Sequence, residues 1–128
     1  MFTADQLIAH AVGDYLLQSD WMATEKTQRS VAAAAHALVY TLPFALLTQS
    51  PAALAFVAGS HFVIDRLRLA RYVCWAKNWI APVRPAPWRE CAGNGYAPDR
   101  PAWLTTWLLI IADNTLHACC NAAALRWL

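Results

Sequence analysis

The stretch VAAAAHALVYTLPFALLTQSPAALAFVAGSHFVI, residues 31–64, decides the fold class of this chain. Its 34 residues include no aspartate, glutamate, lysine or arginine. A helix needs about 20 apolar residues to cross a bilayer, so the stretch is long enough for most of two crossings. Pro43 predicts a kink in the first of these helices, over 31–49, and Ser50 with Pro51 predicts the cap and first turn of the second. We therefore expect an all-α integral membrane protein.

The composition of the whole chain agrees with a membrane protein. Of 128 residues, 59% are hydrophobic and 14% are charged, against about 45–50% and about 25% in ordinary soluble domains. The length predicts a single domain over residues 1–128. The first residues lack the basic and short apolar regions of a cleaved signal peptide, so we expect the first helix to remain in the mature protein. A formal net charge of +2 argues against nucleic acid as a partner.

Capping and breaking signals place the other helices. Thr3 and Gln6 fit a capping box that starts a first helix, which the polar stretch from residue 19 ends. Ser30 is expected to cap the helix over 31–49. The helix that begins at Pro51 is expected to continue past Asp65 into an amphipathic stretch. Together with a fourth helix at the end of the chain, these helices are expected to form a bundle of four transmembrane helices.

A loop rich in proline and glycine, residues 80–101, is expected to separate the third helix from a fourth over 103–127. Four crossings put this loop and the connection between the first two helices on the same side of the membrane. Nine of the ten basic residues fall on that side: Lys26, Arg29, Arg66, Arg68, Arg71, Lys77, Arg84, Arg89 and Arg100. By the positive-inside rule this side is cytoplasmic, which predicts a bacterial inner (cytoplasmic) membrane protein with both termini periplasmic.

The four histidines carry the most specific chemical signal, because every one falls inside an expected apolar helix. Three of them have an aspartate four residues away, in the pairs His10/Asp14, His61/Asp65 and Asp113/His117. A spacing of four places both side chains of a pair on one helix face, one turn apart. An unpartnered aspartate in lipid costs roughly 2.5–3.5 kcal/mol, and a divalent cation would remove that cost. The helix faces that carry these histidines and aspartates are therefore expected to point into the bundle.

We predict a metal centre inside the bundle. The candidate ligands are His10, Asp14, His36, His61, Asp65, Asp113 and His117. Imidazole and carboxylate together suit zinc best, with iron or manganese as alternatives, and carboxylate-rich bundle cores can hold two metals. Seven ligands exceed the needs of one tetrahedral zinc, so we expect one or two divalent ions. Gln18 and Asn121 extend the same faces and are expected to orient the ligands from behind.

A bound metal would activate water for hydrolysis near the cytoplasmic leaflet, with Asp14 or Asp65 as the catalytic general base. Arg66 and Arg68 directly follow Asp65. They are expected either to snorkel to the interface or to bind an anionic group, which would favour a lipid-like or phosphate-bearing substrate.

Other interpretations of the same residues stay open. Helical histidine and aspartate pairs are also found as structural ion pairs, and His36, which has no acidic partner, can be an ordinary core residue. Intramembrane chains of these residues also conduct protons or ions, which four short helices would do as a homo-oligomer. A phage lysis or virion-associated membrane protein, a membrane scaffold and a soluble helical assembly protein are further alternatives. The four cysteines form no CxxC pair and are read as free thiols.

The chain resembles a family of bacterial and phage membrane proteins catalogued as domain of unknown function 3307. The resemblance rests on HAVGDYLLQSDW from His10 to Trp21, on His36, on HFVID from His61 to Asp65, and on DNTLH from Asp113 to His117. It implies no established activity. A more distant likeness to inner-membrane metal-dependent hydrolases implies a hydrolytic reaction by analogy alone. Arg66 and Arg68 stand where a lysine is usual in the family, and the long Pro/Gly loop looks like a local elaboration.

Overall fold

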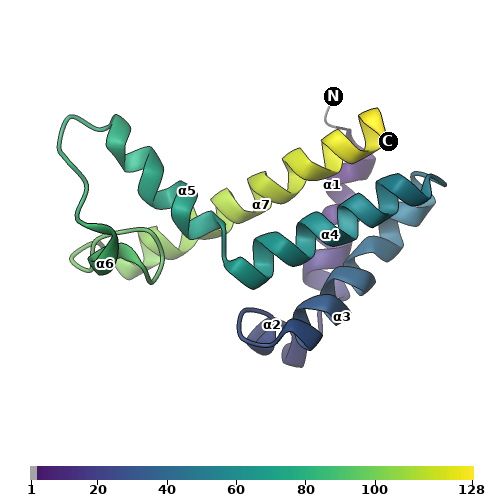
Figure 1. The fold of residues 1–128 in the computed structure, drawn as a ribbon, viewed down its shortest axis with the longest axis horizontal. Coiled ribbons are helices and arrows are strands. Elements are labelled where there is room, and N and C mark those ends of the chain that lie inside the picture. Colours follow the sequence, from purple (N-terminus) through teal and green to yellow (C-terminus); the bar gives the residue numbers. More distant parts are fainter. Residues whose placement is uncertain (1–2) are drawn as a thin grey trace. The chain divides into compact units, whose positions relative to one another are not determined.

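The computed structural model describes residues 3–128, which form helices and loops without any β-strand (Figure 1). The prediction of an all-α protein is therefore confirmed. Two compact units divide the chain, one of Met1–Leu67 with His117–Leu128 and the other of Arg68–Leu116. Within the described part, helix α7 (Ala102–Trp127) is the one helix long and apolar enough to span a bilayer. A bundle of four transmembrane helices stays a prediction.

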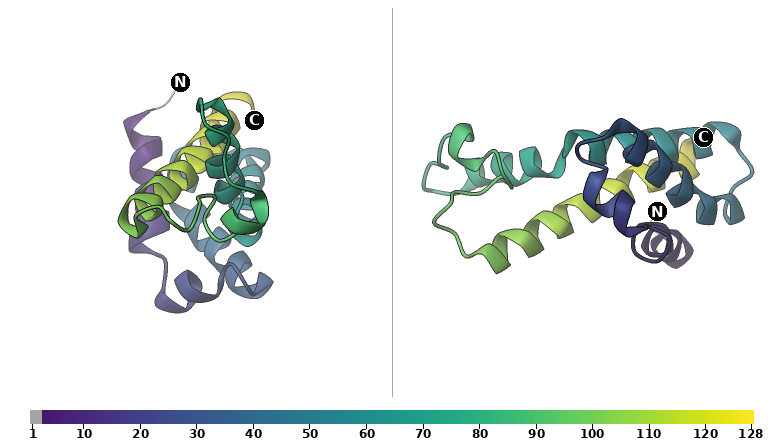
Figure 2. Two further views of the ribbon diagram at one scale, coloured as in Figure 1. Left: turned by 90° about the vertical axis from the view of Figure 1, so that its left-hand side faces the viewer. Right: turned by 90° about the horizontal axis from the view of Figure 1, so that it is seen from below.

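The first unit consists of helices from the first half of the chain together with the end of α7 (Figures 1 and 2). These elements are α1 (Ala4–Ala11), the π-helix η1 (Val12–Leu16), α2 (Asp20–Glu25), α3 (Ser30–Thr41), the 3-10 helix η2 (Leu42–Leu46) and α4 (Pro51–Leu67). Helices α3 and α4 lie side by side, and α3 also packs against α2 and η1.

The capping signals hold in part. Thr3 Oγ1 accepts a hydrogen bond from the backbone amide of Gln6 at 3.2 Å, while Gln6 Nε2 donates to the carbonyl of Ala118 on α7 at 2.8 Å. Ser50 Oγ accepts from the amide of Ala53 at 3.3 Å, and α4 begins at Pro51. The expected role of Ser30 is wrong, because Ser30 is the first residue of α3 and the N-cap position is Arg29.

The interior of the first unit is polar at its centre, and its outer surface is largely apolar. The side chains of His36, His61 and His117 are 0%, 1% and 1% exposed, whereas Leu16 and Leu46 are 75% and 87% exposed. A small apolar cluster completes the interior: Ala9, Tyr40, Phe44, Ala53, Val57 and Ala124. The three alanines of this cluster let the helices approach closely.

The second unit contains α5 (Ala70–Lys77), the 3-10 turn η3 (Asn78–Ile80), the short α6 (Trp88–Cys91) and the beginning of α7. The prediction that one helix continues from Pro51 past residue 65 into this segment is wrong. Arg68 has a φ of +53°, a left-handed conformation that ends α4 at Leu67. The loop over 80–101 is irregular as predicted, apart from the single turn of α6.

Candidate metal centre

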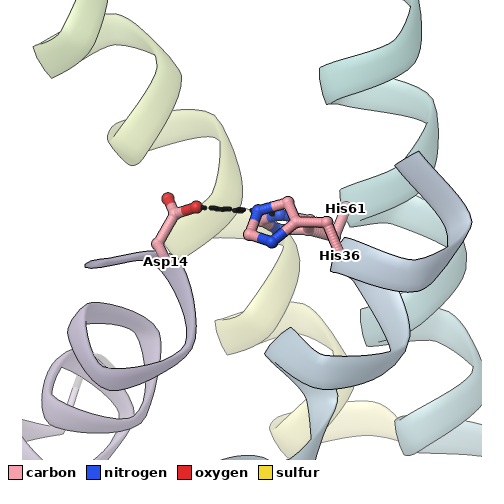
Figure 3. A group of neighbouring side chains, drawn as sticks. All are labelled: Asp14, His36 and His61. Carbon is pink, nitrogen blue, oxygen red and sulfur yellow. Dashed lines mark hydrogen bonds and ion pairs between the residues drawn. The ribbon is translucent and has the colours of Figure 1, made fainter. Parts of the chain in front are cut away.

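Asp14 reaches the interior of the first unit from the π-helical turn η1, which Leu17 N closes by donating to Val12 O at 3.0 Å. Such wide turns are common at functional sites because they redirect a side chain. Gly13 permits the turn to press against α3, since a Cβ at this position would lie 2.8 Å from both Cδ2 and the carbonyl oxygen of Tyr40. Asp14 Oδ1 consequently lies 3.1 Å from His36 Nε2 (Figure 3).

His61 and Asp65 stand one turn apart on α4, as the spacing of four predicted. His61 Nε2 lies 3.1 Å from Asp65 Oδ2, and His117 Nε2 on α7 lies 3.4 Å from Asp65 Oδ1. His36 Nε2 lies 3.5 Å from Asp65 Oδ2. Figure 3 shows Asp14 pointing across the unit toward the rings of His36 and His61. Five predicted ligands therefore meet in one buried layer.

The five ligands form two overlapping groups that could hold a metal ion. One group is Asp14, His36 and His61, and the other is His61, Asp65 and His117. In each group the potential ligand atoms lie within 4.8 Å of one another, and every member is buried. His61 belongs to both groups, so it is the centre of the arrangement.

Lys26, at the end of α2, also enters this layer, and the sequence analysis missed it. Its Nζ lies 2.9 Å from Asp65 Oδ2, 3.2 Å from His36 Nε2 and 3.8 Å from Asp14 Oδ1. The distribution of basic residues assigns Lys26 only to the cytoplasmic side. It follows a short helix with no regular spacing to the histidines, so no periodicity could have placed it. The one signal in the sequence was that aspartates expected in the interior need a nearby cation and that few basic residues could supply it.

The ring nitrogens of His61 have no hydrogen-bond partner among residues 3–128. Both Nδ1 and Nε2 are buried, and although Nε2 is close to Asp65 Oδ2, the contact lacks the geometry of a hydrogen bond. A buried polar atom without a partner costs about 1–3 kcal/mol. Imidazole nitrogen beside carboxylate oxygen is a donor set for zinc, iron or manganese, so a divalent cation fits this site.

Tyr40 and Asn121 support the ligand layer from behind. Tyr40 Oη accepts a hydrogen bond from Asn121 Nδ2 at 2.6 Å and lies 2.8 Å from His10 Nδ1. The tautomer of His10 decides whether its Nδ1 accepts from the Tyr40 hydroxyl or donates to it. The Tyr40 ring also stacks on His61, with the ring centroids 3.7 Å apart. Sequence reasoning gave Tyr40 no role at the site.

Two predicted ligands are not part of these two groups. His10 is buried, with its Nδ1 beside Tyr40 and its ring centroid 5.9 Å from that of His117. Asp113 is half-buried on the section of α7 that belongs to the second unit. Metal binding by either residue stays a prediction.

The remaining candidates lie around the cluster or apart from it. Gln18 is half-buried, and its Oε1 has no hydrogen-bond partner among the described residues. Arg66 Nε donates to Ser30 Oγ at 3.2 Å and its Nη1 donates to Thr27 O at 3.0 Å. Arg68 Nη2 donates to Gly93 O at 2.6 Å in the second unit. Both guanidinium groups thus hold loops in place, and anion binding by them stays a prediction.

A family model described as "Protein of unknown function (DUF3307)" matches residues 2–86. The matched segment contains Asp14, Lys26, His36, His61 and Asp65, and leaves out only His117 of the clustered residues. No curated protein and no solved structure matches the chain.

Proposed function

Because the chain belongs to the DUF3307 family, we propose that its helices η1, α3 and α4 and the end of α7 form a membrane-embedded binding site for one divalent metal ion, most readily zinc, and that the metal serves hydrolysis. The observation that carries the proposal is the meeting of Asp14, His36, His61, Asp65 and His117, which come from four separate helical elements. A buried histidine with two unpartnered ring nitrogens at its centre favours a ligand role over an ordinary structural one.

The charge of the site favours one ion over two. Asp14 and Asp65 contribute two negative charges and Lys26 one positive charge, which leaves −1 when the histidines are neutral. One divalent cation compensates the two carboxylates, whereas two would leave a large excess of positive charge in a buried place. The shared position of His61 leads to the same stoichiometry, since a single lone pair binds a single ion.

A membrane location is supported by the inverted polarity of the first unit. Its interior holds charged and imidazole groups while leucines such as Leu16, Leu38 and Leu46 are exposed, which is the arrangement expected in lipid. Helix α4 has 17 residues, or about 25 Å at 1.5 Å per residue. That is slightly short of a hydrocarbon core of about 30 Å, and local thinning of the bilayer accommodates such a mismatch. We place the loops that carry nine of the ten basic residues in the cytoplasm of a bacterium.

Hydrolysis is the reaction that this donor set suits best. A bound divalent metal would lower the pKa of a water molecule, and a carboxylate that is not needed as a ligand would take its proton. Asp14 is the best base, because it faces two of the histidines from the π-helical turn η1, while Asp65 faces three. The substrate we propose is a phosphate-bearing, lipid-like molecule of the cytoplasmic leaflet.

Metal analysis of the detergent-purified protein tests the central claim. We expect about one equivalent of zinc after loading and dialysis, its loss in His61→Ala, and its retention in the control Asp5→Asn, which changes an exposed carboxylate outside the cluster. His10→Ala, measured beside them, decides whether His10 belongs to the ligand set. Equal metal content in the wild type and His61→Ala, or none in both, would contradict the proposal.

Two further measurements test the location and the reaction. The protein should stay in the membrane pellet after alkaline carbonate extraction, and recovery in the soluble fraction would rule out embedding. The zinc-loaded protein should release phosphate from short-chain phosphatidic acid in mixed micelles. Asp14→Asn should keep its zinc but lose about 100-fold or more of this activity. Unchanged turnover in Asp14→Asn would exclude Asp14 as the base.

A further inference from the structure

Among the described residues, Lys26 is the one lysine or arginine in the ligand layer, and its ammonium group is surrounded by potential metal-ligand atoms. Its Nζ faces Asp65 Oδ2 at 2.9 Å, His36 Nε2 at 3.2 Å and Asp14 Oδ1 at 3.8 Å. Three acceptors from three helical elements therefore surround one ammonium group. An ammonium carries three donors and no acceptor, and Lys26 uses it to hydrogen-bond His36 Nε2 and to form ion pairs with the two carboxylates.

The partner of His36 Nε2 depends on the tautomer of the ring. This nitrogen lies 3.2 Å from Lys26 Nζ and 3.1 Å from Asp14 Oδ1. A single ring nitrogen either accepts from the lysine or donates to the carboxylate, and it cannot do both. When it accepts from Lys26, the lone pairs of His36, Asp14 and Asp65 all converge on the same positive charge, as they would on a metal ion.

The geometry points to Lys26 as an internal substitute for the metal: its ammonium occupies the cation position of the site and leaves when a divalent ion binds. This inference rests on the proposed function. Binding of the metal and withdrawal of Lys26 are then one exchange, which couples occupancy of the site to the position of the segment between α2 and α3.

The charges make exchange more favourable than joint occupancy. With two carboxylates and neutral histidines, a divalent ion alone leaves the site neutral, whereas a divalent ion together with Lys26 leaves +1. An uncompensated buried charge is costly, and a cation displaced to the surface regains its hydration. The two cations would also repel each other at the short distances between these ligand atoms.

The path for the exchange lies along the lysine side chain. Lys26 is 16% exposed, compared with 7% for Asp14, 4% for Asp65 and 0% for His36. It comes from the end of a six-residue helix, and the residues after it form a turn. A long, flexible side chain in such a place can swing out to water without moving α3 or α4.

Amine labelling of the wild-type protein tests the exchange directly, because the chain has only two lysines, Lys26 and Lys77. Reductive methylation is followed at each lysine by peptide mass spectrometry, with and without one equivalent of zinc. We expect zinc to raise the labelling rate of Lys26 severalfold and to leave that of Lys77, whose Nζ lies over the Tyr96 ring, unchanged. Protection of Lys26 in protein that has bound zinc would overturn the inference and leave metal binding intact.

Zinc affinity gives a second, independent measurement. Lys26→Met should bind zinc about tenfold or more tightly in competition with a chromophoric chelator, since the competing cation is removed. Arg29→Met is the matched control, because Arg29 belongs to the same segment but is exposed and pairs with Glu25. Binding by Lys26→Met but not by the wild type would also support the inference. Equal affinities would overturn it, and absence of zinc from both proteins would defeat the proposed function along with it.

Discussion

The two units of the chain use their polar groups in opposite ways. In the first unit, imidazoles, carboxylates and one lysine are gathered in the interior, and the exposed positions are largely apolar. In the second unit, the exposed Arg68 donates to the backbone carbonyl of Gly93, and the half-buried Arg71 donates to that of Ala92. Aromatic rings accompany them there: Tyr72 stacks on Trp88 with centroids 4.6 Å apart, and Arg71 lies over both rings.

The two units therefore differ in what the loss of a hydrogen-bond or ion-pair partner costs in free energy. Water can replace a partner lost from an exposed arginine, so single changes in the second unit should have small effects. A group buried in the first unit has no such substitute, so its partners are needed for folding as well as for binding. Matched substitutions in the two units measure this contrast.

The two lysines, one in each unit, should give the largest contrast. In metal-free protein, Lys26→Met leaves Asp14 and Asp65 without their cation, and breaking a buried pair in this way costs about 3–5 kcal/mol. Lys77→Met removes only the contact over Tyr96, worth about 0.5–1 kcal/mol. Denaturant unfolding in mild detergent measures both. Addition of zinc should restore most of the stability of Lys26→Met, and equal losses in the two variants would show that the first cluster is not strongly desolvated.

Two glycines provide the next contrast. Gly13→Ala would place a Cβ 2.8 Å from the side chain and the backbone of Tyr40, and overpacking of this kind costs about 1–3 kcal/mol. It should also lower the rate of phosphate release, because η1 must move away from α3 and carry Asp14 with it. Gly93→Ala in the second unit meets nothing within 4 Å and should change stability by less than about 0.5 kcal/mol. A neutral Gly13→Ala would mean that the π-helical turn is not fixed by this contact.

Helical spacing explains why much of the candidate site was predictable. His61 and Asp65 stay on one face of α4 whatever surrounds them, and the charge-free run of residues 31–64 predicts two adjacent apolar helices. With the membrane location that we propose, burial of their polar residues follows from the cost of leaving them in lipid. Helical spacing and the polarity of each side chain can both be read from neighbouring residues, so the sequence alone predicts them.

The parts that were not predictable depend on contacts between distant segments. The π-helical turn arises where Gly13 meets Tyr40, and the end of α4 at Arg68 carries no proline or glycine to signal it. Lys26 reaches the ligands from an irregular segment with no helical spacing to them. Tyr40 looked like one more apolar residue of α3, although its hydroxyl binds two polar partners.

Tyr40 and Tyr72 give the last of the three contrasts, which has the same expected size as that of the glycines and is the most specific one. Tyr40→Phe keeps the ring stacked on His61 but removes the hydroxyl from Asn121 and His10, which should cost about 1–3 kcal/mol. Tyr72→Phe loses an exposed contact with Arg71 and should cost less than about 0.5 kcal/mol. Unfolding of the metal-free proteins gives both values.

A double-mutant cycle shows whether the cost in Tyr40→Phe comes from the unsatisfied partner. When Asn121→Leu is added to Tyr40→Phe, the amide left without its acceptor is removed, and part of the lost stability should return. Simple addition of the two single effects would mean that the hydrogen bond of 2.6 Å contributes little. Zinc binding should survive in Tyr40→Phe, because the ring that supports His61 remains. Complete loss of zinc would instead identify the phenolic oxygen as a ligand.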